Sequence, residues 1–273
     1  MNKTEAKHRR KLNDEQLEVL ELLYKFRFGS NDLIAQYFGK KDRSFVFKRL
    51  KILLEQELIG KRFDSSYRIQ GKPAAYYLLP GGARKLQEHR DSEDDQVNIK
   101  GIYKDKFVSE TFIQHSLNIF ASYNQLKAHY GNSIDFFTKS DLATYDHYPK
   151  PLPDAFLSLE AEGSTKHFFV EVQENSQPFF TAVRKVKKYI DYKESGDWAI
   201  TETDFPTILF ICESASLQKR LQKQIAKMLD KTLTDDLVFA TATIEELRRL
   251  KDDAAVWRLA SDPDEPLDLR SIL

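Results

Sequence analysis

The chain has 273 residues, of which 41% are hydrophobic and 12% aromatic, and this composition excludes a largely disordered protein. A single cysteine, Cys212, excludes an internal disulfide and a cysteine-based zinc site. The apolar runs are too short for a membrane helix, and no apolar stretch typical of a signal peptide is found near Met1, so we expect a cytoplasmic protein that does not bind membranes.

The formal charges balance, with 42 Lys and Arg against 42 Asp and Glu, but they are unevenly distributed. Residues 1–90 hold 20 Lys and Arg against 11 Asp and Glu, and the remaining residues hold 22 against 31. Such a split indicates a basic part that binds a polyanion, joined to an acidic part. Uneven partition of ordinary surface charge explains the same numbers equally well. The length favours two domains.

Three short helices and a β-ribbon are predicted in the first third of the chain. Leucines at helical spacing indicate the first helix, which Asn13 can cap and Gly29 ends. Apolar runs between glycine and proline signals indicate the ribbon. The predicted elements are helices at 15–28, 32–38 and 43–57 and strands at 58–63 and 72–79.

This order resembles the winged helix-turn-helix family of DNA-binding modules, over about residues 12–86. In that family the third helix enters the major groove and the ribbon touches the DNA backbone. The resemblance implies phosphate contacts that make DNA affinity sensitive to salt. The implied DNA-binding residues are Arg43, Ser44, Lys48, Arg49 and Lys51 on the helix and Lys61, Arg62, Arg68 and Lys72 on the ribbon. A winged helix that serves only protein interaction or dimerisation is the alternative.

A run of charged residues at 91–96 has no apolar period and predicts a linker. We therefore expect a winged-helix domain at 1–90, a linker at 91–107 and, at 108–273, a second α/β domain with a central mixed sheet. The second domain is predicted to contain helices at 108–130, 178–193 and 216–229 and strands at 134–138, 207–211 and 237–242, with two further strands on either side of a turn at 161–164.

The two strands that flank this turn carry the most informative residues of the chain. With the turn centred near Gly163, antiparallel pairing places Asp154 opposite the stretch from Glu171 to Gln173, on the same face. Alternation along the strand puts Val172 on the other face. Burial of two carboxylates costs several kcal/mol unless partners or a cation compensate, so the pattern indicates a site for a divalent ion.

The order of these elements, with Asp154 and the Glu-x-Gln of the next strand, resembles the core of the PD-(D/E)xK nuclease superfamily. This resemblance implies a magnesium-dependent DNA endonuclease in which Asp154 and Glu171 hold Mg²⁺, for which Mn²⁺ can substitute. Gln173 stands at the position of the family's lysine and carries no charge.

The helix after the second motif strand offers cations that can replace the missing lysine. Lys188 shares a helix face with Arg184 at a spacing of four and with Lys185 at a spacing of three. The implied catalytic residues are Asp154, Glu171, Gln173 and Lys188, with Arg184 and Lys185 as further candidates. Solvated cations on an amphipathic helix are the alternative.

Together, the segments 71–78, 153–155, 169–171 and 187–189 resemble the replication-relaxation family of plasmid and mobile-element proteins. This resemblance implies a DNA-binding accessory protein of plasmid replication or mobilisation, with double-stranded DNA, relaxase or replication proteins and a second copy of the chain as partners. His115 and Asn118, three residues apart on the helix at 108–130, are further candidate site residues.

Two other functions fit the same sequence. A winged-helix transcriptional regulator would carry a catalytically inactive second domain for dimerisation or sensing, and an adaptor would bind other DNA-processing proteins. Metal binding at Asp154 and Glu171 is expected only for the nuclease-like protein, whereas a regulator binds its operator without metal.

Overall fold

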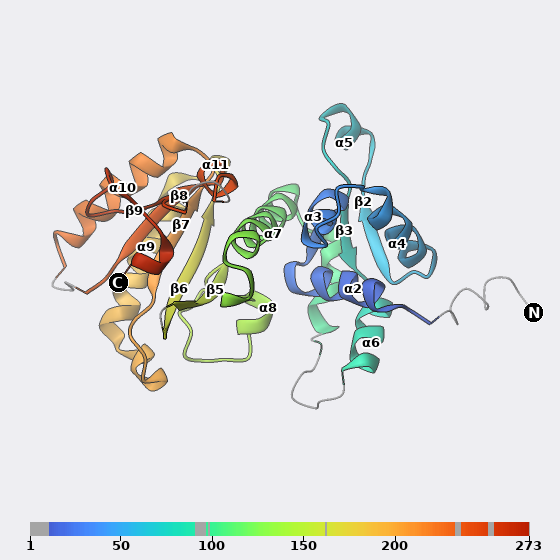
Figure 1. Cartoon of the computed structure of the whole chain (residues 1–273), viewed down its shortest axis with the longest axis horizontal. Helices are drawn as coiled ribbons and strands as arrows, with labels where there is room; N and C mark the ends of the chain where they lie inside the picture. Colours follow the sequence, from blue (N-terminus) through green and yellow to red (C-terminus); the bar gives the residue numbers. More distant parts are fainter. Residues whose placement is uncertain are drawn as a thin grey trace, which may run out of the picture. The chain divides into compact units, whose positions relative to one another are not determined.

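The computed structural model describes residues 11–90, 97, 99–161, 163–232, 236–250 and 254–272. The chain forms two compact units, Met1–Ala121 and Ser122–Leu273, and each is described by itself. Figure 1 labels their helices and strands. Within the described residues, none of the helices has the length and apolar character needed to span a membrane.

The first unit contains the predicted winged helix. Its sheet is antiparallel in the order β1-β3-β2, and helices α2, α3 and α4 pack through a core that includes Leu20, Ile34 and Leu50. The side chain of Asn13 caps α2, because its Oδ1 accepts a 2.9 Å hydrogen bond from the backbone N–H of Gln16. The elements are α2 (Asp14–Phe26), β1 (Phe28–Ser30), α3 (Asn31–Tyr37), α4 (Ser44–Glu55), β2 (Ile59–Arg62), α5 (Ser65–Ile69), β3 (Ala75–Leu78) and α6 (Pro80–His89).

The ribbon contains a short helix, α5, between β2 and β3, where the sequence predicts no helix between the strands at 58–63 and 72–79. Asp64 begins this helix, since its Oδ1 accepts hydrogen bonds from the backbone N–H groups of Ser66 and Tyr67 at 2.8 and 3.2 Å. The Tyr67 side chain is buried, which fixes α5 to the rest of the unit. A helix of five residues has too few positions to show a periodic pattern.

The first unit continues past the winged helix into η1 (Ile99–Phe107) and the first part of α7 (Glu110–Tyr130). Ile113 and Leu117 of α7 share a core cluster with Phe28 of β1. The rings of Phe26 and Phe120 are stacked, with centroids 4.4 Å apart. The structure therefore divides the chain inside α7, whereas the sequence predicts boundaries after residues 90 and 107. The predicted linker lies partly outside the described residues.

The second unit is built on a seven-stranded sheet in the order β10-β9-β8-β7-β6-β5-β4. Pairing is antiparallel from β4 to β6, parallel from β6 to β8, and antiparallel again to β10. The predicted fold, with a central mixed sheet, is confirmed. The strands are β4 (Ile134–Thr138), β5 (Ala155–Ala161), β6 (Ser164–Gln173), β7 (Thr207–Cys212), β8 (Phe239–Thr243), β9 (Trp257–Leu259) and β10 (Pro266–Leu267).

Helices α9 and α10 pack on one face of this sheet (Figure 1). Phe169 of β6 and Phe210 of β7 contribute to a core that also contains Val186 of α9 and Leu221 of α10. Cys212 is fully buried at the end of β7, and burial raises the pKa of its thiol to about 12. The remaining helices are η2 (Gly131–Ser133), α8 (Lys139–Leu142), α9 (Phe179–Ser195), η3 (Asp197–Thr201), α10 (Ala215–Leu229), α11 (Ile244–Arg248) and η4 (Leu269–Ser271).

Candidate active site

The predicted carboxylates lie at the end of the β5–β6 hairpin. Ala155 is paired with Val170, and Asp154 precedes Ala155 while Glu171 follows Val170, so the register extends to Asp154 and Glu171. Their relative exposures are 2% and 1%. Oδ2 of Asp154 accepts a 2.9 Å hydrogen bond from the backbone N–H of Val172, which holds its carboxylate against β6.

Lys185 of α9 contacts both carboxylates. Its Nζ lies 2.7 Å from Oε2 of Glu171 and 3.1 Å from Oδ2 of Asp154, and it donates a 3.4 Å hydrogen bond to the carbonyl oxygen of Val172. Burial alone would lower the pKa of Lys185, but Asp154 and Glu171 together hold it above its usual value. Lys185 is therefore the cation that joins the two strands of the site.

The second oxygen of Glu171 is held by two other residues of α9. Lys188 Nζ lies 2.8 Å from Oε1 of Glu171, and the Tyr189 hydroxyl donates a 2.6 Å hydrogen bond to the same oxygen. Burial lowers the pKa of Lys188, and Glu171 opposes this effect. Burial raises the pKa of Tyr189 well above its usual value, so the hydroxyl is a donor at neutral pH. Glu171 thus has a fixed orientation.

A third lysine reaches the site from α8. Lys139 Nζ lies 2.6 Å from Oδ1 of Asp154, and half of the lysine side chain is exposed. The capping box of Thr138 and Asp141 forms the short helix that carries Lys139. Sequence reasoning missed this residue, because α8 has only four residues and no periodic pattern.

Gln173 lies two residues after Glu171, on the same face of β6, and is fully buried. Its Nε2 donates a 3.4 Å hydrogen bond to Thr181 Oγ1 at the start of α9. Its Oε1 is buried and has no hydrogen-bond partner in the described part of the chain. Leaving a buried acceptor without a hydrogen bond costs about 1–3 kcal/mol of folding free energy, so this oxygen is a candidate atom for binding a ligand.

Three further residues were predicted for the site: Arg184, His115 and Asn118. Arg184 is exposed, and its guanidinium carbon lies 4.8 Å from the ring centroid of Phe180. His115 and Asn118 belong to the part of α7 that lies in the first unit, and Asn118 Oδ1 accepts a 3.0 Å hydrogen bond from Gln114. Among the described residues there is no group of three or more His, Cys, Asp and Glu side chains that could hold a metal.

The residues predicted to contact DNA differ in how they are engaged. On α4, Lys48 and Lys51 are exposed, whereas only 18% of the Arg49 side chain is exposed. Arg49 forms an ion pair with Glu15, and its guanidinium carbon lies 3.3 Å from the ring centroid of Phe45. Two predicted residues at the start of α4 have local partners: Arg43 pairs with Asp32, and Ser44 bonds to Asp42.

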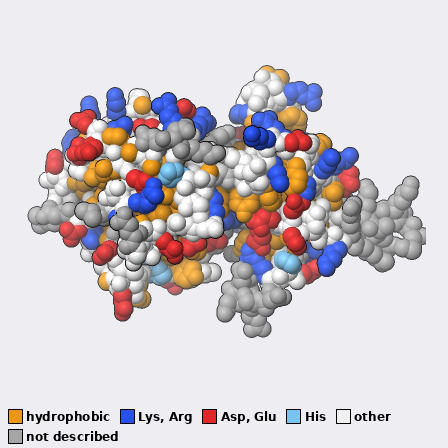
Figure 2. All heavy atoms as spheres, in the orientation of Figure 1, with side chains coloured by type: hydrophobic (Ala, Val, Ile, Leu, Met, Phe, Trp, Pro, Cys, Tyr) orange, Lys and Arg blue, Asp and Glu red, His pale blue; other side chains and the backbone are white. Residues whose placement is uncertain are grey.

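On the ribbon, Arg62 is also engaged inside the first unit. Its guanidinium donates to the carbonyl oxygens of Lys106 and Val108 at 3.0 and 3.2 Å and lies 2.7 Å from Oε1 of Glu110. Lys61, Arg68 and Lys72 are exposed. Figure 2 shows Lys and Arg side chains gathered at the tip of the ribbon. The exposed lysines of α4 and of the ribbon, together with Arg68, are therefore directed to solvent.

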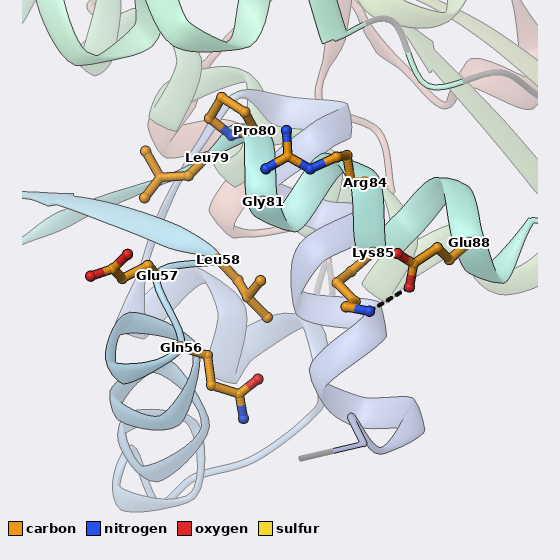
Figure 3. A pocket seen from close by; sticks show the side chains of 9 residues that line it. All are labelled: Gln56, Glu57, Leu58, Leu79, Pro80, Gly81, Arg84, Lys85 and Glu88. Carbon is orange, nitrogen blue, oxygen red and sulfur yellow. Dashed lines mark hydrogen bonds and ion pairs between the residues drawn. The ribbon is translucent and has the colours of Figure 1, made fainter. Parts of the chain in front are cut away.

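A pocket of about 520 Å³ lies in the first unit and contains none of the predicted site residues (Figure 3). Lys85 and Glu88 form an ion pair at its edge. It is lined by Gln56, Glu57, Leu58, Leu79, Pro80, Gly81, Arg84, Lys85 and Glu88.

Comparison with known proteins gives one family and several solved structures. A family model described as replication-relaxation matches residues 20–208. No curated protein matches the chain. A mutant of ZitR from Lactococcus lactis is similar with a TM-score of 0.27 and 24% identity, over 38% of this chain and 68% of that chain.

Restriction endonuclease FokI is similar with a TM-score of 0.33 and 13% identity, over 87% of this chain and 44% of that chain. The same endonuclease bound to DNA gives a TM-score of 0.31 and 11% identity, over 89% and 46%. The chain thus spans less than half the length of FokI.

Proposed function

Because the chain belongs to the replication-relaxation family, we propose that it is a cytoplasmic, DNA-binding accessory protein of plasmid or mobile-element replication or mobilisation. In this proposal the first unit binds double-stranded DNA, and the second unit cleaves a DNA strand with the help of magnesium. One observation carries the enzymatic part: the buried carboxylates of Asp154, just before β5, and Glu171, on the adjacent strand β6, both lie within ion-pair distance of one lysine.

The donor atoms of the site fit a magnesium ion. Asp154, Glu171 and the unpartnered Oε1 of Gln173 offer only oxygen atoms. Mg²⁺ prefers oxygen ligands and is usually held by one or two carboxylates together with water and substrate phosphates. Asp154 and Glu171 would hold the ion, with Mn²⁺ as a substitute. When bound, the ion would lower the pKa of a water molecule and offset charge on the scissile phosphate.

The remaining residues of the site have roles that follow from their contacts. Tyr189 and the backbone N–H of Val172 orient Glu171 and Asp154. Lys185 and Lys188 bring positive charge that the uncharged Gln173 lacks, and such charge stabilises the five-coordinate transition state of phosphodiester cleavage more than the ground-state phosphodiester. Gln173 would then position a ligand or water rather than neutralise charge.

In the first unit, DNA binding is proposed to rest on exposed lysines. Lys48 and Lys51 of α4 would contact phosphates along the major groove, and Lys61 and Lys72 of the ribbon would contact the neighbouring backbone. Relaxase or replication proteins are the protein partners that we propose. A homodimer would place two winged helices on a palindromic site.

One observation favours a second candidate function, a winged-helix transcriptional regulator with a catalytically inactive second unit. The two carboxylates already have three lysine ammonium groups as partners, Lys139, Lys185 and Lys188, so their charge is compensated without a metal. In such a regulator the second unit would serve dimerisation or sensing.

Nicking of supercoiled plasmid DNA separates these two functions. We expect wild type to produce open-circular DNA only when Mg²⁺ or Mn²⁺ is present, and Asp154→Asn and Glu171→Gln to lose this activity while they still bind DNA. Lys187→Gln is the matched control, because Lys187 is an exposed cation of the same helix outside the site. Wild-type protein that binds DNA but does not nick with either ion would support the regulator.

A further inference from the structure

We propose that Lys185 is a built-in counter-ion that competes with the divalent ion for the same oxygen atoms, so that the ion binds only when Lys185 leaves. This proposal rests on the proposed function, since it concerns the same two carboxylates. It adds a form of regulation to the site: metal binding and lysine release become one event.

The contacts of the Lys185 ammonium group carry the proposal. Its Nζ has three protons, and three oxygens surround it: Oε2 of Glu171 at 2.7 Å, Oδ2 of Asp154 at 3.1 Å and the carbonyl oxygen of Val172 at 3.4 Å. These oxygens come from the end of β6 and from the residue that precedes β5. A cation that bridges Asp154 and Glu171 would need the space and the oxygen atoms that this ammonium group now uses.

The other two lysines do not have this position. Of the two carboxylates, Lys188 contacts that of Glu171, through Oε1, and it also donates a 3.2 Å hydrogen bond to the carbonyl oxygen of Pro151. Lys139 contacts the carboxylate of Asp154, through Oδ1. Neither uses the oxygens that Lys185 uses. Both can therefore stay in place when an ion enters. The Lys185 ammonium group would instead lie at contact distance from the ion, and the two positive charges would repel each other. Of the three lysines, Lys185 is the one that occupies the position a divalent ion would need.

The Lys185 side chain is 22% exposed, compared with 10% for Lys188, and its flexible four-carbon stem would let the ammonium group turn toward solvent. When it leaves the carboxylates, a phosphate group of bound DNA is the natural new partner. DNA and the divalent ion would then favour each other's binding. Either ligand would release Lys185 from Asp154 and Glu171, and this release is what the other ligand needs. The site would then bind the ion more tightly when DNA is bound than when DNA is absent.

The first test compares Mn²⁺ affinity by titration calorimetry in wild type, Lys185→Met and Lys188→Met. Both variants remove one positive charge next to Glu171, so Lys188→Met controls for charge alone. We expect Lys185→Met to bind Mn²⁺ more tightly than wild type by about tenfold or more, a typical size for coupling between two sites. Lys188→Met is expected to show a smaller gain.

The second test uses wild-type protein and thus does not depend on the folding of a variant. Acetylation of lysines by an N-hydroxysuccinimide ester is followed by mass spectrometry with and without Mn²⁺. We expect modification of Lys185 to increase with the ion and modification of Lys188 to stay unchanged. Asp154→Asn should remove the increase, because it removes one of the oxygens that the ion and Lys185 share.

The outcomes separate this inference from the proposed function. Tighter Mn²⁺ binding by Lys185→Met, together with wild type that never nicks DNA, supports the inference and overturns the nuclease. Equal gains in the two lysine variants, or weaker binding by Lys185→Met, overturn the inference even when wild type nicks DNA. Absence of Mn²⁺ binding in both wild type and Lys185→Met overturns both.

Discussion

The hydroxyl of Tyr189 donates a 2.6 Å hydrogen bond to Oε1 of Glu171, and both side chains are out of contact with water. A hydrogen bond to a charged group contributes about 1.5–3 kcal/mol. We expect Tyr189→Phe to lower the free energy of unfolding by this amount, measured by urea denaturation. Tyr192→Phe is the control, since it removes a bond to the uncharged carbonyl oxygen of His147 and should cost about 0.5–1.5 kcal/mol. Equal losses would contradict a stronger contribution from the bond to Glu171.

Two lysines that contact Asp154 should differ in their effect on stability. Lys185 bridges two buried carboxylates, so Lys185→Met leaves them facing each other and should cost about 3 kcal/mol in metal-free buffer. Half of the Lys139 side chain is exposed, and Lys139→Met should cost less than about 1 kcal/mol. Chemical denaturation of both variants checks the order, and a larger loss in Lys139→Met would contradict it.

For DNA binding we expect Lys48→Ala to weaken affinity and to reduce the slope of log affinity against log salt by about 0.9, the value for one phosphate contact. Arg49→Ala should leave the slope unchanged and lower stability instead, because Arg49 is paired with Glu15 and stacked on Phe45. Fluorescence anisotropy at several salt concentrations measures both slopes. A reduced slope in Arg49→Ala alone would show that this arginine leaves Glu15 to contact DNA.

A fragment of residues 1–121 should fold, whereas a fragment of residues 1–90 should not. The shorter fragment lacks Ile113, Leu117 and Phe120, which are buried in the first unit. Each such side chain contributes about 1.5–3 kcal/mol, and together they approach the whole stability of a small domain. Circular dichroism melting of the two fragments gives the answer. A cooperative transition in the shorter one would place the boundary at the predicted linker.

His167 predicts a loss of stability in mild acid. Burial lowers its pKa below the usual 6.5, and the Asp204 carboxylate partly opposes this effect. The folded state therefore binds the proton more weakly than the unfolded state, so the stabilisation is complete above pH 6.5 and is lost as the pH falls through the lower pKa of the folded protein. Urea denaturation between pH 7 and about pH 5 should show a smaller pH dependence in His167→Phe than in wild type. Parallel curves would contradict this.

Much of the fold was readable from sequence because its elements are long and marked by turn residues. The β5–β6 hairpin shows alternating side chains and a turn at Gly163, which has the positive φ that glycine favours. Helix α7 was also predicted, but its membership of two units was not. Its apolar residues indicate a helix without indicating which core each of them enters, since that depends on tertiary packing.

The candidate site was only partly readable for the same reason. The sequence pattern placed Asp154 and Glu171 on the two strands of one hairpin and Lys188 on the helix that follows. Tyr189 was not among the predicted site residues, and its hydroxyl meets Glu171 only because of the way α9 lies on β6. Lys139 comes from a helix too short to predict. Contacts between elements that are distant in sequence need the structure.

Cys212 offers a way to observe the opening of the second unit directly. The thiol is fully buried on β7, in the middle of the seven-stranded sheet, and burial raises its pKa to about 12. A thiol reagent can modify it only in molecules whose sheet has opened, since both access and thiolate formation require exposure. As the single cysteine of the chain, it needs no engineered label. The rate at which the thiol is modified reports how often β7 opens. A divalent ion or DNA that binds the second unit should lower this rate.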